Sequence, residues 1–309
     1  MKNYQTLLYS KNGYSSMCLA NMMLSIQQGE RIPTVQEFSV KIGLARGTIQ
    51  NALKFLIDQN AIELESRGHL GTFLKKKNMR ALFGFAGIDS IVGVMPLPYS
   101  KRYEGLATGL ITGLENQYDI PMSLAYMRGA QNRIAMLMDG RYDFAVVSQY
   151  AAQGIIKNDK VKISIVKSFG RQSYLANHIL LLHDKNANGI RDGMRIGVDK
   201  DSVDQMKLTE KVCKDYTVEF VPMNYNNVID FVVKGKVDAA IWNEDELQDK
   251  ALDINYIKVN SDHQSDTEAV LVVKRENETM FRLLDEIISV ETVLDTQRLV
   301  MEDKISPSY

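Results

Sequence analysis

Apolar side chains recur at helical spacing in two runs between residues 31 and 58, and a glycine separates the runs. The first run is Val35, Phe38 and Ile42, and the second is Ile49, Ala52, Leu53, Leu56 and Ile57. Each spacing places its apolar residues on one face of a helix. Gly43 suits the left-handed turn that follows a helix end. The pattern therefore predicts helices over 34–42 and 48–58, joined by a tight turn.

A pattern of period two follows the second predicted helix. Residues 62–65 alternate between apolar and polar as in a strand, 66–68 are turn-forming residues, and 71–74 form a returning strand. Upstream, another amphipathic helix that ends near Gly29 is predicted from Leu19, Met22, Met23 and Ile26. Helices followed by a hairpin are the order of elements in a winged helix-turn-helix, so this part of the chain is expected to read DNA.

The second helix has a polar face opposite its apolar stripe. This face contains Arg46, Gly47, Gln50, Asn51 and Lys54. Gln and Asn pair bidentately with adenine, Arg pairs with guanine, and Lys favours phosphate. For Gln50 or Asn51 taken alone, an ordinary solvated face explains the residue equally well. The hairpin would bring Arg67 and His69 near the DNA backbone or the minor groove.

The segment resembles the winged-helix domain of GntR-type bacterial repressors. The matching motifs are Pro33-Thr34…Phe38, Gly43, Arg46-Gly47-Thr48-Ile49 and Gly71-Thr72-Phe73-Leu74. The resemblance implies DNA contacts from Arg46, Thr48 and the wing. The family usually has arginine where this chain has Gln36 and Gln50, so we expect a different operator sequence. The expected DNA-contacting residues are Thr34, Gln36, Arg46, Gly47, Thr48, Gln50, Asn51, Lys54, Arg67, Gly68 and His69.

Charge is segregated along the chain. Residues 1–77 hold ten Lys and Arg against five Asp and Glu, a net charge of +5; the rest hold 27 against 33, a net charge of −6, so the total is −1. Only the N-terminal part is therefore expected to meet a polyanion. Lys75-Lys76-Lys77 closes this part, either as a solvated linker or as a contact to phosphate.

Length and composition limit the remaining possibilities. A chain of 309 residues is long enough for two domains. Residues 1–16 lack a signal-peptide pattern, and no apolar run approaches the roughly 20 residues of a membrane span, so we expect a cytoplasmic protein without a membrane partner. Cys18 and Cys213 indicate neither a disulfide framework nor a metal knuckle. Residues 184–193 have calcium-loop spacing, but Arg195 replaces the bidentate Glu, so no metal or cofactor is expected.

The larger part of the chain contains an internal repeat with an offset of 95 residues. Asn132, Gly140, Asp143 and Ala145 match Asn227, Gly235, Asp238 and Ala240. Each copy predicts a helix, a glycine at the helix end, and an aspartate that leads into a buried strand. Strands over 91–94 and 195–198 begin the two halves. The repeat therefore predicts two βαβαβ units.

The segments between and after these units complete a two-lobed pattern. Further strands are predicted over 161–166, 175–182 and 269–273, and helices over 280–290 and 293–301. A chain that leaves one lobe, builds a second and returns is typical of a hinged binding protein. The pattern resembles the type 2 periplasmic-binding-protein fold, and the whole chain resembles the YhfZ family of transcriptional regulators.

We therefore expect a small winged helix-turn-helix domain followed by a two-lobed α/β domain of the type 2 periplasmic-binding-protein class. The expected parts are a DNA-binding domain over 1–77, a linker over 78–90 and an effector domain over 91–309, with lobe 1 at about 91–175 and 265–309 and lobe 2 at about 185–260.

In such sheets, a ligand binds beyond the carboxyl ends of the strands, at helix N-termini. The expected ligand-binding residues are Tyr99, Ser100, Arg128, Ser148, Gln149, Asp199, Ser202, Trp242 and Asn243. Helix capping is the alternative role for Ser100 and Ser202, and core packing is the alternative for Trp242. Arg128 with two helix N-termini favours an anionic ligand, either a carboxylate or a phosphate.

The favoured function is a non-enzymatic transcription factor that senses a small metabolite. It would bind a palindromic operator in double-stranded DNA as a homodimer, and lobe closure would change the spacing of its DNA-binding domains. One alternative makes the C-terminal module an enzyme, although no nucleophile elbow, phosphate loop or dinucleotide fingerprint occurs in the sequence. The other alternative makes it a dimerisation scaffold with an empty cleft.

Overall fold

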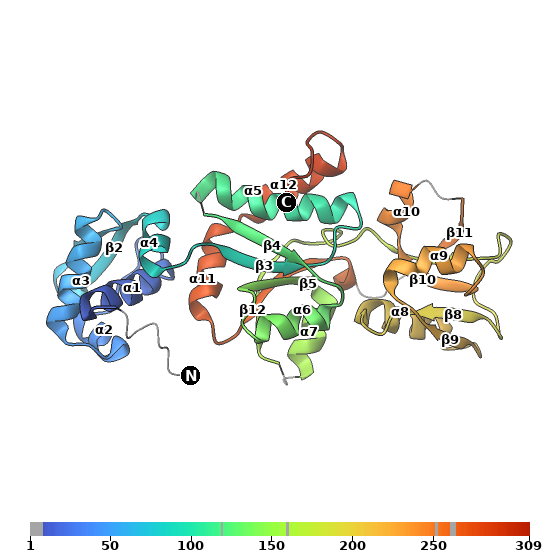
Figure 1. Ribbon diagram of the computed structural model, residues 1–309, viewed down its shortest axis with the longest axis horizontal. Helices are drawn as coiled ribbons and strands as arrows, with labels where there is room; N and C mark the ends of the chain where they lie inside the picture. Colours follow the sequence, from blue (N-terminus) through green and yellow to red (C-terminus); the bar gives the residue numbers. More distant parts are fainter. Residues whose placement is uncertain (1–8, 119, 159–160, 251–252, 260–263) are drawn as a thin grey trace. The chain divides into compact units, whose positions relative to one another are not determined.

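The chain folds into two compact units. Figure 1 shows their helices and strands. The computed structural model describes residues 9–118, 120–158, 161–250, 253–259 and 264–309. Unit 1 comprises Met1–Ile91, Leu114–Met122 and Asn277–Ile288; unit 2 comprises Val92–Gly113, Ser123–Glu276 and Ser289–Tyr309. Among the described residues, no helix is long and apolar enough to cross a membrane.

Unit 1 contains the predicted helices, turn and hairpin in the predicted order. Its elements are α1 (Lys11–Leu24), α2 (Val35–Ile42), α3 (Arg46–Asp58), β1 (Ile62–Ser66), β2 (Thr72–Lys77), α4 (Met79–Ala86) and α11 (Glu278–Ile287). Thr34 caps α2, because its Oγ1 accepts a hydrogen bond from Glu37 N at 3.2 Å while the Glu37 carboxylate accepts one from Thr34 N at 2.6 Å. Gly43 ends the helix with φ 76°. Pro33 precedes this cap and lies outside the first helical turn.

Buried apolar side chains hold the helices and the hairpin of this unit together. Its largest fully buried side chains include Leu19, Met23, Phe38, Ile49, Leu56 and Leu74. β1 and β2 pair antiparallel, and a short 3-10 turn at Gly68–Leu70 joins them. The helix-turn-helix and its wing are therefore positioned by apolar residues that the helical and strand periodicities identify.

The segment 78–90, which the sequence predicts as a linker, contains helix α4. Asn78 caps it by accepting a hydrogen bond from Ala81 N at 3.1 Å. Its apolar face consists of Met79, Leu82, Phe83 and Ala86, all buried, and it packs against α1. The lysines at 75–77 do not form a solvated linker. They belong to β2, and the Lys77 side chain is fully buried.

Two five-stranded sheets form the lobes of the C-terminal part. The first has the order β4-β3-β5-β12-β6 and the second the order β11-β7-β10-β8-β9. The first lobe contains β3 (Ile91–Met95), α5 (Lys101–Tyr118), β4 (Met122–Tyr126), α6 (Ala130–Met138), β5 (Phe144–Ser148), α7 (Gln149–Asn158), β6 (Ile163–Ser168), β12 (Ala269–Lys274) and α12 (Val290–Met301). The second contains β7 (His178–Leu182), β8 (Arg195–Val198), α8 (Val203–Cys213), β9 (Glu219–Pro222), α9 (Val228–Val233), β10 (Ala239–Asn243), α10 (Glu244–Lys250) and β11 (Asn255–Lys258).

The chain leaves the first sheet after β6 and returns to it at β12, as the sequence predicts. Each lobe has a parallel βαβ core, since β3 pairs with β5 and β8 pairs with β10 in the parallel direction. An antiparallel strand then extends each sheet: β12 beside β5, and β7 beside β10. The two crossings between lobes are the expected hinge segments.

The repeated aspartates hold the strands of each lobe together. Val92 N donates to Asp143 Oδ2 at 2.8 Å, and Asp143 N donates to Val92 O at 2.7 Å. In the second lobe, Arg195 N donates to Asp238 Oδ2 at 2.7 Å, and Asp238 N donates to Arg195 O at 2.8 Å. Gly140 and Gly235 end their helices at φ 76° and 64°. The aspartates and glycines that the two copies of the repeat share therefore have a structural role in each lobe.

Close packing of α5 against α12 predicts a stability effect at one glycine. A Cβ at Gly109 would lie 2.6 Å from the carbonyl oxygen of Val293, whereas a Cβ at Gly113 would meet nothing nearer than 3.9 Å. Gly109→Ala is expected to lower the free energy of unfolding by about 1–3 kcal/mol, because overpacking forces the helices apart. Gly113→Ala is the matched control and should leave it unchanged or raise it by up to about 1 kcal/mol. Urea unfolding measures both, and equal effects from the two substitutions would contradict the packing argument.

Candidate functional site

Helix α3 presents an exposed polar face opposite its buried residues. Ile49, Ala52, Leu53 and Leu56 are buried. The exposed candidates for DNA contact on the helices are Thr34, Gln36, Arg46, Gly47, Gln50, Asn51 and Lys54, and Thr48 is half-buried. The structure therefore places these side chains where a duplex can reach them, apart from the Thr34 hydroxyl, which caps α2.

The N-terminus of α3 has no side-chain cap. Its N-cap residue is Ala45, which offers no side-chain acceptor to the first N–H groups of the helix. Such N–H groups and the positive end of the helix dipole favour a phosphate oxygen. Arg46 Nε donates to Gln36 Oε1, so two of the expected DNA-contacting side chains are already paired with each other.

The wing holds its arginine against the hairpin. Arg67 Nη2 donates to Glu65 Oε2 at 2.8 Å, and its guanidinium lies 4.4 Å from the centre of the Phe73 ring. Gly68 has φ 56°, and His69 is exposed beside it. The wing candidates thus lie at an exposed hairpin tip.

Asn51, one of the candidates for DNA contact on α3, also lines a groove. This groove has a volume of about 420 Å³, lies between α1, α3 and α4, and is also lined by Phe55 and Phe85. Gln50 and Lys54 do not line this groove. Of the polar residues on α3, these two are the clearer candidates for reading DNA.

A cavity of about 90 Å³ lies between the two lobes of unit 2. Its lining comprises Pro96, Leu97, Tyr99, Tyr103, Met127, Arg128, Gly129, Ala130, Arg133, Tyr174, Leu175, His178, Asp199, Ser202, Gln205 and Tyr225. The sequence-predicted residues in this lining are Tyr99, Arg128, Asp199 and Ser202. The cavity therefore forms at the carboxyl ends of the strands, where the sequence order places it.

The serines among the ligand candidates divide into two kinds. Ser100 Oγ accepts from Tyr103 N at 3.5 Å, and Ser148 Oγ accepts from Ala151 N at 3.1 Å, so both cap helices and are buried. Ser202 stands at the N-cap of α8 without a capping hydrogen bond, and it lines the cavity. Of the three, only Ser202 is left for a ligand.

The remaining candidates contact other residues of the protein. Trp242 is buried and stacks on Tyr225, with ring centres 4.1 Å apart and planes inclined by 19°. Tyr225 in turn lines the cavity. Asn243 Oδ1 accepts from Asp245 N at 3.0 Å, and Gln149 N donates to Glu268 O at 2.8 Å. Trp242, Asn243, Gln149, Ser100 and Ser148 are therefore outside the lining of this cavity.

Arg128 is already neutralised across the cleft. Its Nη2 donates to Asp199 Oδ2 at 2.7 Å, which joins the first lobe to the second. Asp199 is buried and also accepts hydrogen bonds from Tyr225 N and Asp201 N, both at 3.0 Å. The hydroxyl of Tyr99 adds another bond between the lobes, to Asn226 Oδ1 at 2.6 Å. The lobes thus meet around the cavity in a closed arrangement.

Arg133, the second cation of the lining, is not among the residues predicted from the sequence. It is 3% exposed, and its guanidinium donates to Val146 O at 3.0 Å, Met127 O at 2.7 Å and the Tyr174 hydroxyl at 3.0 Å. All three acceptors are neutral, and no carboxylate among the described residues pairs with it. The internal repeat offered a signal, because Arg133 corresponds to the fully buried Val228 at the offset of 95. An arginine at a core position of a helix marks a special environment.

Aromatic hydroxyls and one neutral histidine complete the lining. Burial raises the pKa of Tyr103 and of Tyr225 well above the ordinary value, so both hydroxyls stay protonated and can donate. Burial lowers the pKa of His178, while the nearby carboxylate of Asp266 opposes this shift. Within the part of the chain that the structure describes, His178 Nε2 has no hydrogen-bond partner. The cavity therefore offers polar atoms to a ligand as well as apolar walls.

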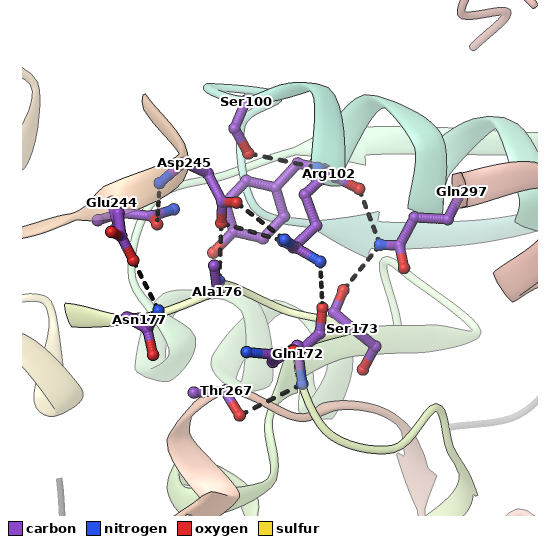
Figure 2. Close-up of polar contacts among 12 residues, drawn as sticks. Ser100, Arg102, Gln172, Ser173, Ala176, Asn177, Glu244, Asp245, Thr267 and Gln297 are labelled. Atoms are coloured by element: carbon purple, nitrogen blue, oxygen red, sulfur yellow. Dashed lines mark hydrogen bonds and ion pairs between the residues drawn. The ribbon is translucent and has the colours of Figure 1, made fainter. Parts of the chain in front are cut away.

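An ion pair at the crossing between the lobes reinforces the closed arrangement (Figure 2). Arg102 of α5 donates from Nε and Nη2 to both carboxylate oxygens of Asp245 in α10, at 3.0 and 2.9 Å. Arg102 Nη1 also donates to the backbone oxygen of Gln172, and Asp245 Oδ2 accepts from Ala176 N at 2.8 Å. The pair therefore links both lobes to the segment that crosses between them.

Two further polar side chains fasten the same crossing segment, as Figure 2 shows. Gln297 Nε2 of α12 donates to Arg102 O at 2.9 Å and to Ser173 O at 2.8 Å. On the side of the second lobe, Asn177 Nδ2 donates to Glu244 Oε2 at 2.6 Å. The hinge is thus a hydrogen-bonded junction, and the cavity-lining Tyr103 and Tyr174 are its direct neighbours in the sequence.

The N-terminal part of the chain is a helix-turn-helix with a β-hairpin, and the C-terminal part has two α/β lobes around a cavity. The protein is therefore a helix-turn-helix protein with a periplasmic-binding-protein-like C-terminal domain. Residues 78–309 match the YhfZ C-terminal domain family, and residues 27–74 match a helix-turn-helix domain family. The chain belongs to the YhfZ family.

Individual relatives agree with this assignment. The YhfZ protein of Escherichia coli strain K12 is 33% identical over 303 residues, which are 97% of this chain and 98% of that protein. The crystal structure of YhfZ from Shigella flexneri is also 33% identical, with a TM-score of 0.60 over 74% of this chain and 97% of that one. The periplasmic aliphatic sulphonate binding protein SsuA of Escherichia coli has 12% identity and a TM-score of 0.53 over 70% of this chain and 74% of that one, a likeness of fold alone.

Proposed function

We propose that this protein is a DNA-binding transcriptional regulator whose C-terminal domain senses a small anionic metabolite, with a carboxylate as the favoured anionic group. The single observation that carries the ligand class is the Arg133 guanidinium, which is buried beside the cavity with neutral partners only. A buried charge is costly unless a counter-charge or strong hydrogen bonds stabilise it. An anion in the cavity would supply Arg133 with a counter-charge, as Asp199 does for Arg128.

The electrostatics of the cavity support an anion in a second way. Helices α6 and α8 both begin at the cavity, at Gly129 and Ser202, and neither N-cap residue makes a side-chain capping bond. Their positive ends therefore add to the charge of Arg133. The cavity is smaller than an apolar cavity of about 150 Å³ that holds benzene, which favours a compact ligand.

The output of the sensor would be the winged helix in unit 1. We infer that it binds double-stranded DNA in the GntR manner, with α3 in the major groove and the wing against the backbone or the minor groove. A homodimer on a palindromic operator in the cytoplasm fits such a reader, because two half-sites double the contacts. The metabolite would act by binding one lobe arrangement more tightly than the other.

A thermal-shift comparison on the full chain tests the ligand class. The probes are acetate, propionate and lactate, with acetamide and propionamide as uncharged counterparts and phosphate and sulfate as other anions. A carboxylate at about one hundred times its dissociation constant should stabilise the folded protein by about 2.7 kcal/mol. Arg133→Met should abolish this shift, while Arg141→Met, an exposed arginine of the same lobe, should retain it.

The outcomes separate the candidate functions. If the amides stabilise the protein as strongly as the carboxylates do, the ligand needs no negative charge, and this would contradict the proposal that Arg133 binds an anion. Consumption of a stabilising probe would make the module an enzyme instead of a sensor. A response to none of the anions would favour the dimerisation scaffold with an empty cleft.

A further inference from the structure

Lys77, at the end of the predicted DNA-binding domain, has a fully buried side chain. Its Nζ donates to Leu24 O at 3.0 Å, to Ile26 O at 2.8 Å and to Glu286 Oε2 at 2.6 Å. The side chain is 0% exposed. Three acceptors use all three protons of the ammonium group. Two of these acceptors close the C-terminal end of α1, and the third belongs to α11, some 200 residues further along the chain.

Helix α11 is thereby fastened to the winged helix inside unit 1. It packs against α1 and belongs to the same unit as residues 1–91. One turn before Glu286, Arg282 forms a second ion pair with Glu30 at 3.6 Å, and both of its side chains are largely exposed. Exposed pairs contribute little and the loss of one partner of a buried pair is costly, so of these two ion pairs the Lys77 pair is the stronger link between α11 and the DNA-binding domain.

One hydrogen bond and a short stretch of chain connect the cavity lining to α11. Tyr174, which lines the cavity, donates from its backbone N to Thr267 O at 2.8 Å. Two residues later β12 begins, and only residues 275–277 separate the end of β12 from α11. A change in the lobe crossing near Tyr174 would therefore reach α11 through one strand and a three-residue connection.

We propose that Lys77 couples the DNA-binding domain to the effector domain, so that α11 and the winged helix respond as one element. This inference rests on the proposed function and names the contact through which it is regulated. Lys77 acts as a positioning residue, since it touches neither the cavity nor the exposed face of α3. Its substitution should separate the two responses while leaving each domain folded.

Hydrogen exchange on the full chain tests the coupling without any effector. The probe is a palindromic duplex obtained by DNA selection with the wild-type protein. Coupling free energy is reciprocal, so duplex binding at α3 should also protect the amides of residues 278–287. At a duplex concentration about one hundred times Kd, exchange through openings shared by both elements should slow by about a hundredfold. In Lys77→Met, α3 should keep this protection and α11 should lose it.

Two matched substitutions control for charge and for the second ion pair. Lys75→Met removes an exposed lysine from the same strand, and Arg282→Gln removes the exposed pair with Glu30. Both variants should keep the protection of α11. Should Lys77→Met not fold, Glu286→Gln replaces it and should reduce the protection, because the ammonium group would lose its counter-charge.

The exchange measurements distinguish failure of the coupling role of Lys77 from failure of DNA binding. Protection of α11 that persists in Lys77→Met overturns the coupling role. Wild-type protein in which the duplex protects α3 but not α11 also overturns it. Failure of any duplex to protect α3 in the wild type contradicts DNA binding itself, and hence the proposed function.

Discussion

A Gln50→Ala variant is expected to bind the selected operator duplex more weakly than the wild type, by about 5- to 150-fold for each half-site that it contacts. Gln50 is exposed on α3 while the opposite side of this helix is buried. A good bidentate contact from glutamine to adenine contributes about 1–3 kcal/mol of discrimination, and each 1.4 kcal/mol corresponds to a factor of ten. In a homodimer the loss applies to each half-site. Fluorescence anisotropy at one fixed salt concentration measures the effect, because salt alone changes such affinities strongly.

Two variants on the same helix distinguish base reading from general attraction. Gln59→Ala removes an exposed glutamine just beyond the other end of α3 and should leave binding unchanged. Lys54→Ala should weaken binding to all duplexes alike and reduce the salt slope by about one, as loss of a phosphate contact does. Equal loss from Gln50→Ala on the operator and on a scrambled duplex would show that Gln50 reads no base.

Arg102→Met is expected to lower the free energy of unfolding by about 3–5 kcal/mol. The ion pair between Arg102 and Asp245 is largely shielded from water, with side chains 12% and 11% exposed. Removal of one partner leaves the other charge buried without its counter-charge, and this is the costly case. The substitution also removes a donor to the backbone of Gln172 in the crossing segment. Urea unfolding of the full chain measures the change.

A double substitution separates the ion pair from simple loss of packing. Arg102→Met combined with Asp245→Leu should recover much of the stability, because no unpaired charge then remains. The neighbouring Lys101→Met is the control, since its pair with Asp303 is exposed and exposed pairs contribute at most about 1 kcal/mol. A loss from Arg102→Met as small as that from Lys101→Met would contradict the role of the junction.

The winged helix was predictable because its determinants are local. Phe38, Leu53 and Leu56 follow a helical period, Gly43 has the left-handed conformation that its position requires, and β1 and β2 alternate around a short turn. The linker prediction for 78–90 was less accurate, because a short apolar stretch identifies neither its conformation nor its packing partner. Burial of α4 against α1 depends on residues about 60 positions earlier in the chain.

The cleft was predictable in its position and only partly in its residues. Strand order places side chains at the carboxyl edge, and four of the residues predicted in this way, Tyr99, Arg128, Asp199 and Ser202, line the cavity. Strand order cannot tell which side chains turn inward, so the prediction included Ser148, which caps α7, and Trp242, which stacks on the lining residue Tyr225. It also missed residues whose side chains reach the cavity from within helices or from the crossing segment, namely Tyr103, Arg133, Tyr174, His178 and Gln205.

By itself, the sequence determined that this protein has a winged helix-turn-helix and a two-lobed α/β domain, because helical and strand periods, glycine turns and an internal repeat are all local patterns. Only the tertiary structure decided that Arg128 is neutralised by Asp199 while Arg133 is buried with neutral partners. It alone also showed that Lys77 reaches Glu286. Charge pairing depends on distances between residues far apart in the chain, and these distances exist only once the core has formed.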